Sequence, residues 1–154
     1  MVCDWGRRSV PSKIAVAAQT GLLLGVLWYI ALGSAIGGGA RYLLSRAAQD
    51  WGAFTFPAGT LLVNVLGAFA LGFVMRYALD TSAMSTELRA FLTTGFCGGF
   101  TTFSAFSYET AAQLEDGNYK RAGAYVLLSV VGCLLAMYLG FAGARGVSSV
   151  LRGR

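Results

Sequence analysis

Four long stretches without a charged residue limit what this chain of 154 residues can fold into. They contain 27, 25, 19 and 23 residues and cover positions 14–40, 51–75, 90–108 and 122–144. A helix needs about 20 predominantly apolar residues to cross the hydrocarbon core of a membrane. The four stretches leave little sequence for a soluble domain. We therefore expect an all-α membrane protein with four transmembrane helices per chain.

The composition agrees with a membrane protein and argues against several classes of function. Only 12% of the residues are charged, whereas a soluble domain has about 25%. The sequence has no histidine, which argues against haem, imidazole metal sites and the usual general bases. Its cysteines, Cys3, Cys97 and Cys133, have no redox or metal-ligand spacing. We therefore expect no enzyme activity.

The net charge of +5 does not indicate a nucleic-acid partner. The lysines and arginines lie at the ends of the expected spans, where such residues anchor a protein at the lipid headgroups. We therefore expect this chain to contact membrane lipid and to bind no nucleic acid.

The expected organisation is a single transmembrane domain between two short tails. A basic and poorly ordered tail is expected over residues 1–20, the four-helix domain over 21–150 and a C-terminal tail over 151–154. The expected spans are 21–44, 57–77, 86–113 and 119–147. Pro57 suits a first helical turn, an acid at Glu87 suits the N-terminal end of the third span, and "LEDGNY" predicts the turn into the fourth. The N-terminus also resembles a signal peptide ending near "ALGSA", but its apolar run exceeds the usual 7–15 residues or so, which favours an uncleaved span.

Positive charges are almost evenly divided between the two faces that four spans create. The face with both tails carries eight lysines and arginines and the other face four, but without the N-terminal tail the numbers are five and four. Orientation follows this bias, so a balanced core is compatible with insertion both ways and with an antiparallel dimer. A single orientation set by the basic tail is the alternative.

The third stretch contains "GFCGGFTTFSAFSYE", residues 95–109, which does not suit a plain lipid-facing helix. Nine of the 19 uncharged residues in this stretch are Gly, Ser or Thr. In hydrocarbon a freed backbone group is costly, so an irregular segment has to be buried in protein or line a cavity. We expect such a break at Gly98, Gly99, Thr101 and Thr102. Close helix packing through small residues is the alternative.

Beyond the expected break, aromatic rings and hydroxyls share one helical face. Phe103, Phe106 and Ser107 project within about a 100° arc at 100° per residue. The edge of a phenylalanine ring is positive, and hydroxyl hydrogens are stronger donors. This face suits an anion, although core packing is the alternative for the two rings.

Polar side chains also lie at membrane depth in the second and fourth stretches. Asn64, an amide among apolar neighbours, indicates a functional role or an interhelical hydrogen bond. Tyr125 and Ser129 lie one turn apart on one face. The only acid near membrane depth is Glu109, at the end of the third stretch, whereas a proton-coupled pump needs a titratable group at depth. Neutral donors without acids favour an anion over a cation.

Three motifs, "GGGARYLLS", "GTLLVN" and "TGFCGGFTTFSAFSYE", resemble the Fluc/CrcB family of fluoride channels. The resemblance covers about residues 21–150 and includes the order and spacing of the four spans. It implies passive export of fluoride across the plasma membrane of a bacterium. It further implies an antiparallel, dual-topology homodimer with two pores and a central structural sodium ion (Na⁺).

The resemblance also implies roles for individual residues. The fluoride path it implies contains Asn64, Phe103, Phe106, Ser107, Tyr125 and Ser129. Gly98 and Thr101 lie where the family offers backbone carbonyls to Na⁺, two from each subunit, and carbonyl oxygens suit a hard ion. Arg41 resembles the basic residue near the aqueous vestibule, where positive charge concentrates anions. Cys133 stands where a serine or another small residue is expected in the polar track of the fourth span.

Two other classes of protein stay open. A small multidrug transporter also has four spans and dual topology, but it needs a membrane-embedded glutamate in its first span, and residues 14–40 contain none. In a non-transporting assembly protein, the polar face would only join helices. Flux through proteoliposomes distinguishes the three classes.

Overall fold

The computed structural model describes the backbone of residues 13–51, 56–81 and 84–152, and the side chains of residues 23–50, 56–81 and 84–150. All secondary structure in these ranges is helical. In chain order the elements are α1 (Lys13–Trp51), α2 (Ala58–Asp80), α3 (Thr86–Ala90), the π-helix η1 (Phe91–Cys97), α4 (Gly98–Phe100), α5 (Phe103–Glu115) and α6 (Tyr119–Arg152). α3, η1 and α4 follow one another without a gap, and only residues 101–102 separate α4 from α5. We call the segments from α3 to α5 the interrupted helix. The predicted all-α fold with four helices is confirmed.

Within the described residues, three helices are long and apolar enough to cross a membrane. They are Leu23–Asp50 in α1, Ala58–Asp80 in α2 and Tyr119–Val150 in α6. α1 is longer than the predicted span, because its 39 residues extend beyond 21–44 at both ends. Residues 31–35, the "ALGSA" of the signal-peptide alternative, lie inside this continuous helix. The predictions for residues 1–12 and 153–154 lie outside the described residues.

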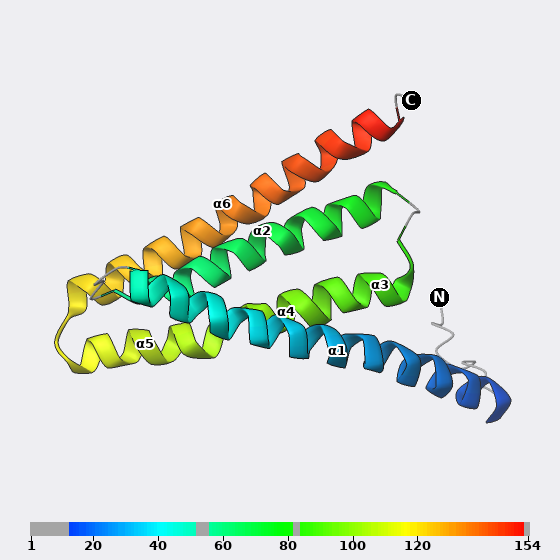
Figure 1. Ribbon diagram of the computed structural model, residues 1–154, viewed down its shortest axis with the longest axis horizontal. Helices are drawn as coiled ribbons and strands as arrows, with labels where there is room; N and C mark the ends of the chain where they lie inside the picture. Colours follow the sequence, from blue (N-terminus) through cyan, green and yellow to red (C-terminus); the bar gives the residue numbers. More distant parts are fainter. Residues whose placement is uncertain (1–12, 52–55, 82–83, 153–154) are drawn as a thin grey trace, which may run out of the picture.

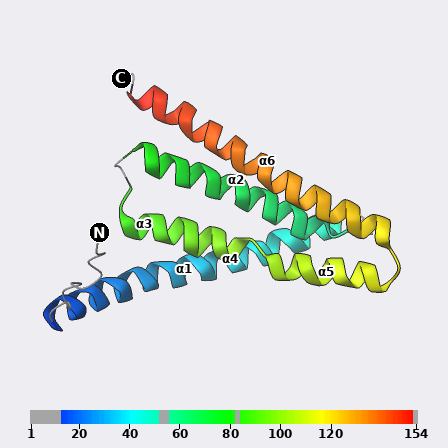
Figure 2. The ribbon, with the colours of Figure 1, turned by 180° about the vertical axis from the view of Figure 1, so that it is seen from behind.

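The helices pack as two neighbouring pairs. α2 and α6 lie side by side along much of their length, and α1 lies along η1 and α4 (Figure 1). The reverse view in Figure 2 shows the same pairs. The end of α6 and the junction of α2 with α3 lie at one end of the molecule, and α5 turns into α6 at the other. This arrangement agrees with alternating passes across a membrane.

Local signals fix the two turns that flank the interrupted helix. Ser85 caps α3, because its Oγ accepts a hydrogen bond from Leu88 N at 3.2 Å. At the other end, Gly117 takes a positive φ of 74°, which glycine tolerates without a steric cost. Asn118 N then donates to Gln113 O at 2.8 Å and ends α5. The predicted start of the third span and the "LEDGNY" turn are confirmed.

Glycines bring α1 and the interrupted helix into close contact. A Cβ on Gly33 would lie 2.5 Å from Phe91 O, and one on Gly99 would lie 2.5 Å from Ser34 O. Only glycine allows the two backbones to approach this closely, as in other membrane helix pairs. The packing interpretation therefore explains Gly99.

The break is shorter than predicted. Gly98 and Gly99 are not part of it, because both lie in α4 and Gly98 has helical φ/ψ angles of −64°/−38°. Thr101 and Thr102 alone separate α4 from α5. The prediction of a mid-span break is confirmed, and the assignment of the two glycines to it is wrong.

Candidate functional site

Thr101 and Thr102 have extended backbones in the middle of the interrupted helix. Their φ/ψ angles are −86°/159° and −149°/113°. Thr102 also begins α5, because its Oγ1 accepts a hydrogen bond from Ala105 N at 3.1 Å. In an uninterrupted helix the Thr102 amide would bond to the Gly98 carbonyl. The extended conformation frees both groups, and such groups need other partners where they are buried.

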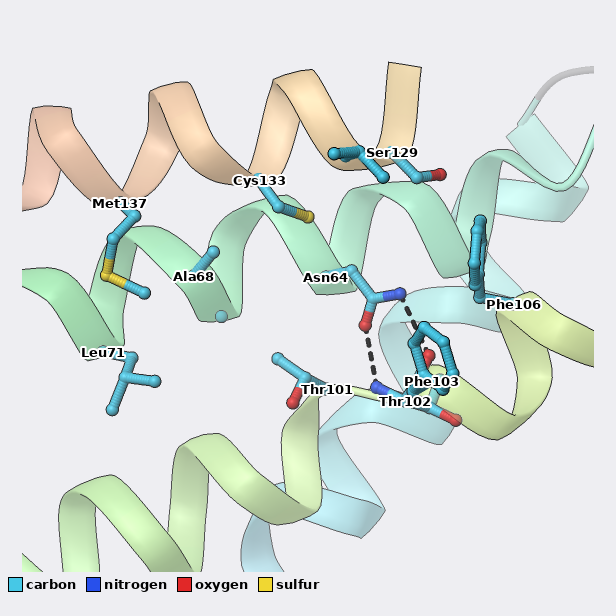
Figure 3. A pocket seen from close by; sticks show the side chains of 12 residues that line it. Asn64, Ala68, Leu71, Thr101, Thr102, Phe103, Phe106, Ser129, Cys133 and Met137 are labelled. Atoms are coloured by element: carbon cyan, nitrogen blue, oxygen red, sulfur yellow. Dashed lines mark hydrogen bonds between the residues drawn. The ribbon is translucent and has the colours of Figure 1, made fainter. Parts of the chain in front are cut away.

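Asn64 of α2 satisfies the freed amide of Thr102 and also binds its carbonyl. Its Oδ1 accepts a hydrogen bond from Thr102 N at 2.7 Å, and its Nδ2 donates one to Thr102 O at 3.0 Å (Figure 3). Thr102 is only 8% exposed, so these groups have little access to solvent. A carboxamide nitrogen carries two hydrogens, and only one is used in this clamp.

A cavity of about 330 Å³, the inner cavity, adjoins the clamp. Four of the predicted fluoride-path residues line it: Asn64, Phe103, Phe106 and Ser129. Ser129 is only 6% exposed, and its Oγ has no hydrogen-bond partner among the described residues. The rings of Phe103 and Phe106 have centroids 5.5 Å apart. None of the residues that line the inner cavity is charged, so its polar character comes from neutral donors.

Two other predicted fluoride-path residues, Ser107 and Tyr125, form hydrogen bonds within the protein. Ser107 Oγ donates to Phe103 O at 2.9 Å, and the hydroxyl of Tyr125 donates to Glu109 Oε2 at 2.6 Å. Neither residue lines the inner cavity. Tyr125 is fully buried and supports the wall, since its ring lies 5.3 Å from that of Phe106.

Glu109 of α5 connects three helices through its carboxylate. Besides the bond from Tyr125 of α6, its Oε1 accepts a hydrogen bond from Thr60 Oγ1 of α2 at 2.7 Å. Thr60 is a residue of this site that the sequence motifs did not indicate. The available signal was its position one turn before Asn64, on the same face of α2.

A second cavity of about 770 Å³, the outer cavity, has a basic wall. Arg41, Arg46, Glu109 and Thr102 are among the residues that line it. The Nε of Arg41 is buried and has no hydrogen-bond partner in the part of the chain that the structure describes. Thr102 also lines the inner cavity, so both cavities reach the helix break. The structure places Arg41 at this outer cavity, and its vestibule role stays a prediction.

Gly98 and Thr101, predicted to offer carbonyls to Na⁺, lie at the two ends of α4: Gly98 begins it and Thr101 follows it. Gly98 is exposed, and a Cβ there would meet nothing closer than Thr93 O at 3.9 Å. Because the Thr102 amide bonds to Asn64, the Gly98 carbonyl loses the partner that a continuous helix would give it. Carbonyl oxygens on an open face fit a hard cation, and one chain would supply only part of its ligands.

The sequence comparisons decide the family. Residues 28–141 match the family model described as CrcB-like protein, Camphor Resistance (CrcB). The chain belongs to the CrcB family. A relative from Geobacter sulfurreducens is 52% identical over 75% of this chain and 94% of its own length. Relatives from Anaeromyxobacter sp. (strain K) and Prosthecochloris aestuarii are 49% and 47% identical, over 73% and 75% of this chain and 89% and 90% of theirs.

All three relatives are named fluoride-specific ion channel FluC, which describes a channel and not an enzyme. The region matched by the CrcB model contains both cavities, the break and Glu109. Together with the three long apolar helices, family membership makes this chain a multi-pass membrane protein.

Proposed function

We propose that this protein is a fluoride-selective ion channel that lets fluoride leave a bacterial cell down its gradient and so lowers fluoride toxicity. One observation carries most of the argument: the buried Ser129 hydroxyl has no hydrogen-bond partner among the residues that the structure describes, and it lines a cavity with Asn64 and two phenylalanine rings. Relatives with 47–52% identity carry the name of a fluoride-specific channel. Their bacterial sources support a place in the bacterial plasma membrane.

The donors in the inner cavity suit a small and strongly hydrated anion. A pore for fluoride has to replace the hydrogen bonds that water gives the ion. The hydroxyl of Ser129 and the second N–H of Asn64 supply donors, and the positive ring edges of Phe103 and Phe106 add a weaker attraction. Since no acid lines the inner cavity, no negative side chain opposes the ion there.

The outer cavity provides an entry for anions. Arg41 and Arg46 raise the local concentration of anions there. From this cavity the proposed path passes Thr102, which both cavities share, and reaches the rings. Glu109 lies at this passage, and its two hydrogen bonds hold the carboxylate against Thr60 and Tyr125. The proposed route therefore combines a basic entrance with a neutral, donor-lined interior.

The functional unit we propose is an antiparallel, dual-topology homodimer. Phe103 is 79% exposed in one chain, so a pore that uses this ring needs a further wall, which a second copy would supply. The nearly equal charge count of the two faces supports insertion both ways. A tag on the C-terminus, probed from each side of the membrane, should be reached from both sides. Access from one side alone contradicts this topology.

We propose a structural Na⁺ at the dimer axis, bound by the carbonyls of Gly98 and Thr101 from each chain. The ion would neutralise converging carbonyl dipoles and would not be transported. If so, Gly98→Ala should weaken the dimer more than Thr101→Ser, because the methyl group obstructs the open face whereas serine keeps the backbone. Dimer dissociation in detergent, measured in Na⁺ and in a bulky organic cation, tests this. Equal stability in both cations argues against the ion.

Efflux from liposomes tests the channel directly. Liposomes that contain the purified protein and potassium fluoride are opened to potassium movement with an ionophore, and a fluoride electrode records release. Fluoride efflux without a proton gradient supports a channel. Protein-free liposomes are the control, and chloride-loaded liposomes followed with a chloride electrode test the selectivity. Proton flux driven by an organic cation would indicate the transporter, and absence of any flux the assembly protein.

A further inference from the structure

A further cavity of about 560 Å³, the α5–α6 groove, runs along the surface between these two helices. Thr110 and Leu114 of α5 line it together with six residues of α6, from Tyr119 to Val130. None of the lining residues is charged, and most are apolar. A surface groove of this kind favours an apolar occupant, because burial of apolar surface stabilises the bound state.

The α5–α6 groove is about as long as one leaflet of a membrane is thick. Between Tyr119 and Val130 the helix rises about 16 Å, and half of the hydrocarbon core measures about 15 Å. The groove begins at the turn from α5 into α6, which lies at one end of the molecule (Figure 1). Tyr119, at this end, is 70% exposed, as is typical of tyrosines at the level of the lipid headgroups. The groove therefore extends from the headgroups to about the middle of the membrane.

The charged side chains at the mouth of the groove oppose the dipoles of both helices. Glu115 and Asp116 end α5, and Lys120 and Arg121 lie in the first turn of α6. The C-terminal end of a helix attracts positive charge and the N-terminal end attracts negative charge, yet α5 has no base in its last turn and α6 no acid in its first. All four side chains are exposed, and none forms an ion pair with a residue that the structure describes. The turn thus presents an acidic and a basic centre that helix stability does not explain.

We propose that the α5–α6 groove and this turn bind one phospholipid with a zwitterionic headgroup, phosphatidylethanolamine. An acyl chain fills the groove. The phosphate binds Lys120, Arg121 and the free amides at the N-terminal end of α6, and the ammonium binds Glu115, Asp116 and the C-terminal end of α5. Phosphatidylcholine lacks ammonium hydrogens for these acids, and the two acids oppose the net negative charge of phosphatidylglycerol. Charge complementarity therefore selects phosphatidylethanolamine over both.

Native mass spectrometry of the full chain in detergent, titrated with each of the three lipids, tests the site. We expect one phosphatidylethanolamine per chain, bound about tenfold more tightly than the other two lipids. Gly123→Leu fills the groove, because a Cβ on Gly123 meets nothing within 4 Å, and should weaken this binding by about tenfold or more. Gly25→Leu, at an equally open position on α1, is the matched control and should bind like the parent. Equal binding by Gly123→Leu and the parent overturns the site.

A second variant tests the headgroup, and the same spectra test the other candidate occupant, a second copy of the chain. Glu115→Gln combined with Asp116→Asn removes the acids, so phosphatidylglycerol should then bind at least as tightly as phosphatidylethanolamine. An unchanged preference in this variant, or equal binding of all three lipids by the parent, overturns the headgroup assignment. A parent dimer that binds no lipid and that dissociates in Gly123→Leu assigns the groove to the contact between copies and overturns the lipid site.

Discussion

Replacing Asn64 with leucine tests whether this amide holds the helix break. Leucine is branched like asparagine but is larger and has no polar atom, so Thr102 N–H and Thr102 C=O would both lose the Asn64 contacts now at 2.7 and 3.0 Å. Thr102 C=O is also the N-cap carbonyl of α5 and keeps the first hydrogen bond of that helix. The main loss is therefore at Thr102 N–H, where a buried polar group left unpaired costs about 1–3 kcal/mol. If the Thr102 amide returns to the Gly98 carbonyl, part of this cost is avoided. That change would close the break and move α5 away from its position beside the inner cavity.

Thermal unfolding in detergent and hydrogen exchange at Thr102 together measure the effect. Exchange of the Thr102 amide should accelerate by about tenfold for each 1.4 kcal/mol lost. Asn64→Asp is the matched control, because it preserves the shape of the side chain and the acceptor for the Thr102 amide. We expect its stability to lie between those of the parent and Asn64→Leu.

Fluoride flux cannot decide this prediction, because leucine also removes a donor from the proposed path. The decisive result is structural. If Asn64→Leu melts with the parent and the Thr102 amide exchanges at the parent rate, the two hydrogen bonds do not hold the break. The account of Asn64 given above is then wrong.

Three further substitutions test the packing, the rings and the buried hydroxyl. Gly99→Ala places a methyl 2.5 Å from a carbonyl of α1 and should lower the free energy of unfolding by about 1–3 kcal/mol through overpacking. Gly38→Ala is the control, because the space there is open. Equal melting temperatures of the two variants contradict the close approach. Phe103→Ile and Phe106→Ile should each slow fluoride efflux by about tenfold or less, because an aromatic contact contributes about 0.5–1.5 kcal/mol. If both variants release fluoride at the rate of the parent protein, the rings serve only in core packing. Tyr125→Phe should lower stability by about 1–3 kcal/mol through the loss of its bond to the carboxylate, and an unchanged melting temperature refutes that contribution.

The number of helices and several of their ends follow from local sequence. Gaps between charges mark the spans because hydrocarbon penalises charge regardless of which helices become neighbours. The Ser85 cap and the Gly117 turn use contacts within a few residues, so their patterns are visible in one segment. The length of α1 was underestimated, because a helix does not have to end where its apolar run ends.

The break was placed too early because glycine has two uses in a membrane helix. It permits irregular backbone, and it also permits close approach of a second helix. Sequence alone does not say that Ser34 of α1 lies against Gly99. Only the neighbouring helix distinguishes the two uses, and here the second one applies.

The residue types at the candidate site could be read from the sequence, but their pairings could not. Asn64 and Tyr125 stand out because polar groups at membrane depth need partners, but those partners are 38 and 16 residues away in the chain. Tyr125 was interpreted as a donor to fluoride, whereas its hydroxyl donates to Glu109. The charge gaps give no information on such distant contacts, which depend on how the helices pack.

The clamp on Thr102 and the proposed fluoride path depend on the same amide. Because Asn64 Oδ1 and one Nδ2 hydrogen are fixed on the backbone of Thr102, the plane of the amide is set. The remaining N–H therefore has a fixed direction beside the inner cavity. A donor fixed in advance needs no reorganisation when charge arrives. In a fluoride channel, the break would thus use the backbone of Thr102 to orient the second N–H of Asn64. A continuous helix could not do this, because its backbone amides are already paired.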